Sequence, residues 1–275
     1  MVKYGDITKS ASDLLNNDYC FDRKFKLKTK TSNGVEFTVE NVMSSKGVAG
    51  KLTTKCAPFD GIKVEKAGVK TNGRLFGEFK LVNAVKGAEF TLKAEDGAGK
   101  SPAGEFAVNY ASGSLNLDAS VDVVNGPTVY GAGTFGYDNF TLGGEVKYNT
   151  GSDGDSGAEV SDFNGALSYS GRDYSVALTT SNKASAYGLS YHHNVSSGVQ
   201  VAAKADVSAK SLAVGGIYNW DSETKFQGKF DSNGVVSANW IQVLRPKVKL
   251  ISSAQVNAKD FSGDSHKFGM SLILG

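Results

Sequence analysis

From Arg23 to the end of the chain, apolar and polar residues alternate with a period of two. The first such segment, RKFKLKTKT, carries a lysine at every second position: Lys24, Lys26, Lys28 and Lys30. Similar segments recur as far as KFGMSLILG, separated by turn sequences such as SNG, TNG, EDGAG and DSNG. We count about nineteen of them at a spacing of roughly a dozen residues, which is typical of antiparallel strands joined by hairpins. The sequence therefore predicts an all-β fold of about nineteen strands.

The segment before Arg23 follows a different period. In YGDITKSASDLLNNDY the apolar residues recur at steps of three and four, as on one face of a helix: Tyr4, Ile7, Ala11, Leu14 and Leu15. We predict one amphipathic helix over residues 4–20, followed by strands over residues 24–275. No linker divides the chain, so residues 1–275 are predicted to form a single domain.

A sheet of nineteen strands is too wide to stay open, and closure into a barrel removes its edges. A barrel that wide is too large for its own side chains to fill, so it encloses water. Its inner face is then polar and its outer face apolar, as in a transmembrane β-barrel. Two soluble β-sandwich domains bury similar alternating strands, so a soluble ligand-binding β protein is the alternative that periodicity leaves open.

Lysines dominate the predicted inner face. The set is Lys24, Lys26, Lys28, Lys30, Lys51, Lys55, Lys93, Lys147, Lys204, Lys225, Lys229, Lys247, Lys249 and Lys267. Fewer carboxylates share this face: Glu89, Glu105, Asp118, Asp122 and Glu145. Rings of lysine favour anions in a pore, although lysines also alternate on ordinary solvated strands. We interpret these lysines as a pore lining that selects for anions.

The sequence offers no case for an enzyme. Three histidines and two cysteines form no cluster with the spacing of a metal or catalytic site, so we expect no catalysis, cofactor or metal. A formal net charge of +2 is too small to indicate nucleic-acid binding.

Several long segments carry a family resemblance. They are DITKSASDLLNNDY with KLKTKTSNGVEFT, then VAGKLTTK, then YNWDSETKFQGKFDSNGVVSANW, and finally LRPKVKLISSAQVNAKDFSGDSHKFGMSLILG. Together they resemble the mitochondrial voltage-dependent anion channels, the eukaryotic porins, over essentially the whole length.

The resemblance implies a nineteen-stranded barrel in the mitochondrial outer membrane, closed by parallel pairing of the first and last strands. It places the N-terminal helix inside the pore as the gating element, with Tyr4, Ile7, Lys9, Asp13 and Leu14. The implied function is voltage-gated, weakly anion-selective passage of ATP, ADP, phosphate and chloride. Membrane lipids, a homo-oligomer and cytosolic docking proteins are the implied partners. The related protein-import channel is the alternative, although it is expected to have an acidic lumen.

The sequence departs from the family pattern in three places. The G-L-K element that follows the fifth strand in the family reads GAE here, at Gly87 to Glu89. The glycine-rich hinge between helix and first strand reads DYCFDR here and contains no glycine. Some members carry a membrane-facing glutamate on the fourth strand, for which Glu65 is the candidate. Because the apolar residues Ile62 and Val64 are expected to face outward, alternation predicts that Glu65 faces inward.

Overall fold

The computed structural model describes residues 2–45, 47–97, 99–124, 128–151, 157–261, 263 and 265–275. A short 3-10 helix, η1 (Tyr4–Asp6), and one α-helix, α1 (Lys9–Asn16), precede the strands. The strands are β1 (Arg23–Lys30), β2 (Glu36–Ser44), β3 (Gly47–Phe59), β4 (Ile62–Lys70), β5 (Leu75–Val85), β6 (Ala88–Gly97), β7 (Lys100–Ser112), β8 (Leu115–Asp122), β9 (Thr128–Tyr137), β10 (Phe140–Asn149), β11 (Glu159–Ser170), β12 (Tyr174–Ser181), β13 (Ala186–Asn194), β14 (Val199–Asp206), β15 (Ser211–Asn219), β16 (Thr224–Asp231), β17 (Val235–Arg245), β18 (Val248–Asn257) and β19 (Lys267–Leu274).

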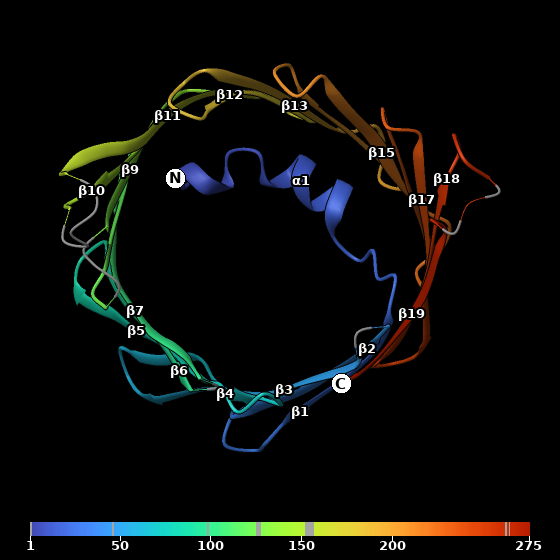
Figure 1. Cartoon of the computed structure of the whole chain (residues 1–275), viewed down its shortest axis with the longest axis horizontal. Helices are drawn as coiled ribbons and strands as arrows, with labels where there is room; N and C mark the ends of the chain where they lie inside the picture. Colours follow the sequence, from blue (N-terminus) through green and yellow to red (C-terminus); the bar gives the residue numbers. More distant parts are fainter. Residues whose placement is uncertain are drawn as a thin grey trace.

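The strands form one closed barrel (Figure 1). Successive strands pair antiparallel, and β1 also pairs with β19 in parallel, from Arg23↔Met270 to Leu27↔Leu274. An odd number of alternating strands leaves the first and last running in the same direction, so they can close the barrel only in parallel. The predicted nineteen-stranded barrel with parallel closure is confirmed.

Tight turns join most strands. In the SNG and TNG sequences, Gly34 and Gly73 both have φ of 81°, a left-handed conformation that glycine adopts without steric cost. These turns hold neighbouring strands in hairpin register, which is why turn sequences separate the alternating segments so regularly.

Polarity is reversed relative to a soluble protein. Large apolar side chains such as Leu142, Phe230 and Met270 are exposed on the outside. The buried side chains of the wall include Thr134, Ser237 and Ser271, which have only 1–2% of their surface accessible. An apolar exterior around a polar interior fits a barrel whose outer face lies in lipid and whose inner face lines water.

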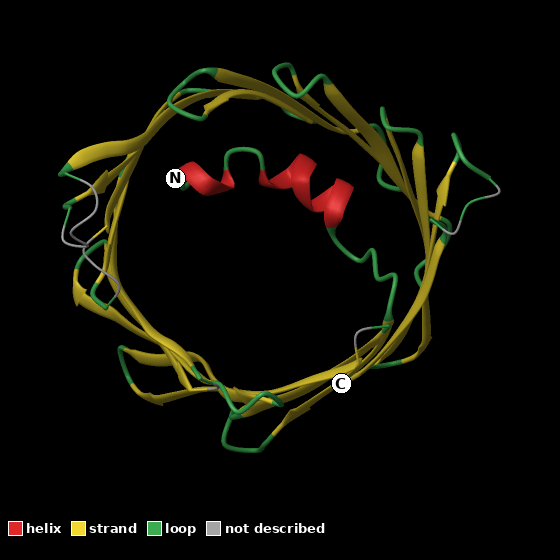
Figure 2. Cartoon of the chain, viewed as in Figure 1, coloured by secondary structure: helices red, strands yellow, loops and turns green. Residues whose placement is uncertain are grey.

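The N-terminal segment lies inside the barrel, across the lumen (Figure 2). The predicted single helix over residues 4–20 is wrong in its extent, because η1 ends at Asp6, α1 starts at Lys9, and Asn17 is already extended. Asp18 then takes φ of 65°, which turns the chain toward β1 without a glycine. Neither described helix is long and apolar enough to cross a membrane.

Candidate functional site: the lumen and its helix

The apolar face of α1 packs against the inner wall. Ala11, Leu14 and Leu15 are buried against Ala202 of β14, with Ala213 and Ile217 of β15 beside them: the only apolar cluster found among the described residues. Leu14 was predicted from the helical period, and its place here follows from that pattern. Because an isolated eight-residue helix is not stable in water, this contact is what keeps α1 folded.

Two wall glycines let the N-terminal segment approach closely. A Cβ atom on Gly143 of β10 would lie 2.9 Å from Tyr4 Cδ2 and 3.1 Å from Ile7 Cδ1. A Cβ atom on Gly215 of β15 would lie 2.9 Å from Leu15 Cδ2. The wall is therefore shaped to receive this segment, and Tyr4 and Ile7, both predicted helix residues, contact it directly. Burial, with the carboxylates of Glu145 and Asp162, raises the pKa of Tyr4 to about 12.

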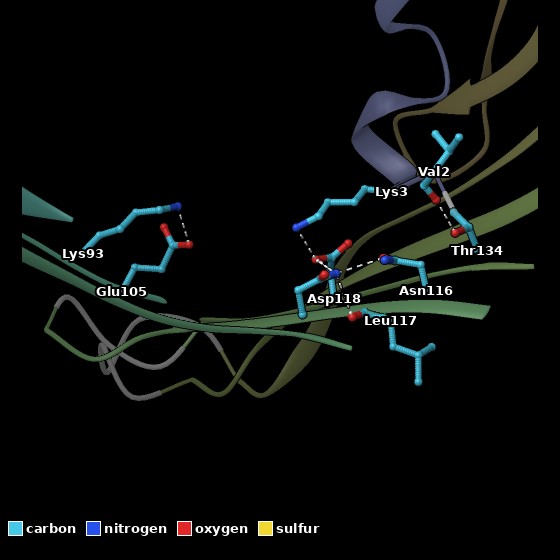
Figure 3. A network of polar contacts seen from close by, with 9 residues as sticks. Val2, Lys3, Lys93, Glu105, Asn116, Leu117, Asp118 and Thr134 are labelled. Carbon is cyan, nitrogen blue, oxygen red and sulfur yellow. Dashed lines mark hydrogen bonds and ion pairs between the residues drawn. The ribbon is translucent and has the colours of Figure 1, made fainter. Parts of the chain in front are cut away.

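Polar contacts fix the start of the segment to β8 and β9 (Figure 3). Thr134 Oγ1 donates a hydrogen bond of 2.6 Å to the Val2 carbonyl, and Lys3 Nζ lies 3.6 Å from an Asp118 carboxylate oxygen. Asn109 Nδ2 donates to the same carboxylate at 2.6 Å. Asp118 was predicted on the inner face, and it holds the segment from there.

A second set of contacts fixes the end of α1. Gln227 Nε2 on β16 donates to the carbonyls of Leu14, at 2.6 Å, and Asn17, at 3.1 Å. These carbonyls belong to the last turn, where the helix itself supplies no donor. Lys249 Nζ lies 3.2 Å from the Asp18 carboxylate, so the bend is held as well. The N-terminal segment is thus attached at both ends.

The other two predicted helix residues contact other residues of the N-terminal segment. Lys9 forms an ion pair of 3.0 Å with Asp6 inside the segment, and it is more than half exposed to the lumen. Asp13 is half-buried, and its main-chain carbonyl accepts the hydrogen bond of the Asn17 amide that ends the helix.

Half of the twelve lysines predicted to select anions are ion-paired. Lys24 and Lys26 share Glu40, at 2.9 and 3.3 Å. The remaining pairs are Lys30–Glu36, Lys55–Glu65, Lys93–Glu105 and Lys249–Asp18. On β1–β7 the positive field is therefore partly compensated by acids on neighbouring strands.

For the other predicted lysines, no ion pair is found in the described part of the chain. Lys28 and Lys51 lie on β1 and β3, and Lys51 Nζ is 4.6 Å from the ring centre of Phe76. Lys225, Lys229 and Lys267 lie on the last strands.

Two of the predicted lysines contact the N-terminal segment, and one lies in a turn. Lys229 Nζ lies 4.6 Å over the ring of Tyr19, and Lys204 Nζ contacts Ser12 Oγ of the helix at 3.4 Å. Lys247 does not lie on the wall as expected. It occupies the turn between β17 and β18, with φ of 71°, because the strand pattern breaks at the bulge before it.

Glu65 lies where β4 shifts register, between Val64 and Lys66. Its carboxylate accepts a hydrogen bond of 2.9 Å from Lys55 Nζ. Lys55 on β3 is the register partner of the lumen residue Glu36 on β2. This contact agrees with the predicted inward direction of Glu65.

The sequence reading missed several acids of the lumen. Glu36, Glu40 and Glu78 each contact a lysine of the neighbouring strand, as in the pair Lys66–Glu78. Glu95 on β6 contacts Lys70 of β4, with β5 between the two strands. Lys26↔Glu40 and Lys30↔Glu36 are directly opposite in the hairpin that SNG closes. Counting back from that turn gives both pairs, so the signal was present in the sequence.

The fold and lumen together define a class. A closed barrel with an apolar exterior and a charged interior is a membrane pore. A family model described as eukaryotic porin matches residues 1–269, and the chain belongs to this family.

Curated relatives match over nearly their full length. "Non-selective voltage-gated ion channel VDAC2" of Meleagris gallopavo is 29% identical, over 98% of this chain and 93% of that protein. "Mitochondrial outer membrane protein porin" of Candida albicans is 29% identical over 98% and 97%. "Mitochondrial outer membrane protein porin 2" of Oryza sativa is 26% identical over 98% and 95%.

Proposed function

We propose that this eukaryotic porin is a voltage-gated, weakly anion-selective channel of the mitochondrial outer membrane. Its permeants are small ions and metabolite anions: chloride, phosphate, ADP and ATP. The observation that carries the proposal is a wide polar lumen whose wall holds lysines without carboxylate partners in the described chain, such as Lys28, Lys51 and Lys225. A conducting pore must release its ions, so a diffuse positive field suits it better than a tight site.

The selectivity test reverses charge on β1. Lys24→Glu combined with Lys28→Glu shifts the reversal potential in a salt gradient toward cation preference, measured in planar bilayers. The control is Lys86→Glu with Lys247→Glu, which changes the same charge in turns outside the strands. Equal shifts in both double variants, or no shift in either, would contradict a selective role for the β1 lysines.

The charge that responds to voltage lies mainly on the wall and not on the N-terminal segment. Residues 2–18 contain Lys3 and Lys9 against Asp6, Asp13 and Asp18, a formal sum of −1. Moving this segment alone therefore transfers little charge. Reversing a two-state preference from 1:99 to 99:1 takes about 5.5 kcal/mol, and one charge crossing the whole field gains about 2.3 kcal/mol per 100 mV. About two to three charges must then move at 100 mV, and the lysine-rich wall is their source.

The role of α1 in this proposal is to narrow the lumen, while the wall lysines sense voltage. Neutralising Lys225 and Lys229 to glutamine should make closure less steep in voltage, as seen in the conductance–voltage curve. The control neutralises Lys86 and Lys247 in the turns. An unchanged slope in the wall variant would refute the assignment of the sensor to these strands.

A further inference from the structure

A groove crosses the outside of the barrel over β16–β19 and reaches the start of β1. Its volume is about 630 Å³, within the range of about 300–1,000 Å³ that ligand pockets occupy. Its floor is formed by small side chains, namely Ala238, Ser252 and Ala254. Small residues on a surface otherwise covered by large apolar ones leave a depression of this kind.

Large side chains form the sides of the groove. Trp240 is 48% exposed and Phe268 is 72% exposed. Trp240 lies near the middle of β17, directly opposite Ser252, whereas aromatic residues of membrane barrels gather at the two interfaces. Its indole ring therefore lies beside the groove on the apolar band, where an acyl chain can pack against it.

The guanidinium group of Arg23 lies at one end of the groove. Arg23 is the first residue of β1, and its register partner Met270 is already the fourth residue of β19; Met270 in turn pairs with Ser252 of β18. Lys24 faces the lumen, where it pairs with Glu40, so alternation turns Arg23 outward. Across the residues that the structure describes, no carboxylate forms an ion pair with Arg23.

We propose that this groove binds one anionic phospholipid, with its phosphate on the Arg23 guanidinium and an acyl chain along the small-residue floor. The guanidinium matches phosphate with two parallel N–H donors. A strand end at the membrane boundary is the depth at which a phosphate lies, and the apolar floor continues from it toward the bilayer interior. The outward Ser252 hydroxyl gives the floor one further polar group. The inference rests on the membrane location proposed above.

Trp240 supplies the probe. In a Trp220→Phe background it is the sole tryptophan, because the chain has two. The protein is reconstituted in phosphatidylcholine vesicles that contain a small fraction of brominated lipid, either phosphatidylglycerol or phosphatidylcholine. Bound brominated lipid quenches Trp240 fluorescence. A charge-assisted contact predicts a preference on the order of tenfold for the anionic lipid.

Three variants sharpen the test. Arg23→Gln should abolish the preference, and Ala254→Phe should reduce quenching by both lipids because it fills the floor. Arg245→Gln, which removes the same charge at the opposite end of the barrel wall, should leave the preference intact.

Some outcomes overturn the proposal. Equal quenching by the two lipids, or a preference that survives Arg23→Gln, excludes a phosphate site. Quenching by neither lipid shows that something else, such as a second copy of the chain, covers the groove. Conductance is recorded from the same preparations. A conducting channel without lipid preference refutes the groove alone, whereas loss of conductance in the parent protein refutes the proposed function.

Discussion

Replacing Gln227 with methionine tests how firmly the wall holds the end of α1. The substitution keeps the length of the side chain but removes the two hydrogen bonds to the carbonyls of Leu14 and Asn17. Each hydrogen bond contributes about 1 kcal/mol net, so docking of α1 weakens by about 2 kcal/mol. At 1.4 kcal/mol per tenfold, the undocked population rises about 30-fold.

Amide hydrogen exchange measures that population. An undocked helix of eight residues unfolds, so exchange of the amides in 12–17 should accelerate by about the same factor. Gln255→Met is the matched control, since Gln255 lies on the wall opposite Lys267 and forms no side-chain hydrogen bond with the helix among the described residues. Equal exchange in the two variants would refute the conclusion that Gln227 holds the helix.

Three further changes probe the lumen. Thr134→Val removes the hydrogen bond to the Val2 carbonyl, which contributes about 1 kcal/mol. Hydrogen exchange of amides 4–7 should therefore accelerate about fivefold. Unchanged exchange would mean that packing at Gly143 is enough to hold the segment on the wall. Gly143→Ala places a methyl group within 3.1 Å of Tyr4 and Ile7, so residues 2–8 should become accessible to limited proteolysis. Cleavage at the wild-type rate would contradict this prediction. Glu40→Gln leaves Lys24 and Lys26 without their shared carboxylate and should move the reversal potential toward stronger anion preference; a move toward cations would show that another group dominates the local field.

The barrel could be predicted from the sequence because the alternation of apolar and polar residues is repeated in every strand. Alternation fixes which face is wet, turn glycines fix where strands end, and the odd count is consistent with the parallel closure. The inward direction of Glu65 followed from the same alternation.

The details of the lumen were harder to predict from the sequence. Helical period alone did not reveal the break at Ile7 and Thr8 or the end at Asn16, because wall contacts and the Gln227 donor decide how much of the segment is helical. The turn position of Lys247 depends on a bulge, and a bulge leaves no period of its own in the sequence. The compensating acids required counting across hairpins, strand by strand.

The parallel seam has a consequence for how the barrel is assembled. Its partners Arg23 and Met270 are about 250 positions apart, whereas Lys30 and Glu36 meet across a short turn. Closing the larger loop costs about 3 kcal/mol more in chain entropy, so β1 meets β19 after the hairpins have formed. Until then β1 is an open sheet edge, and charged lysines on such an edge discourage pairing with other chains. The alternating lysines of β1 thus protect the unfinished barrel from aggregation before they ever line water.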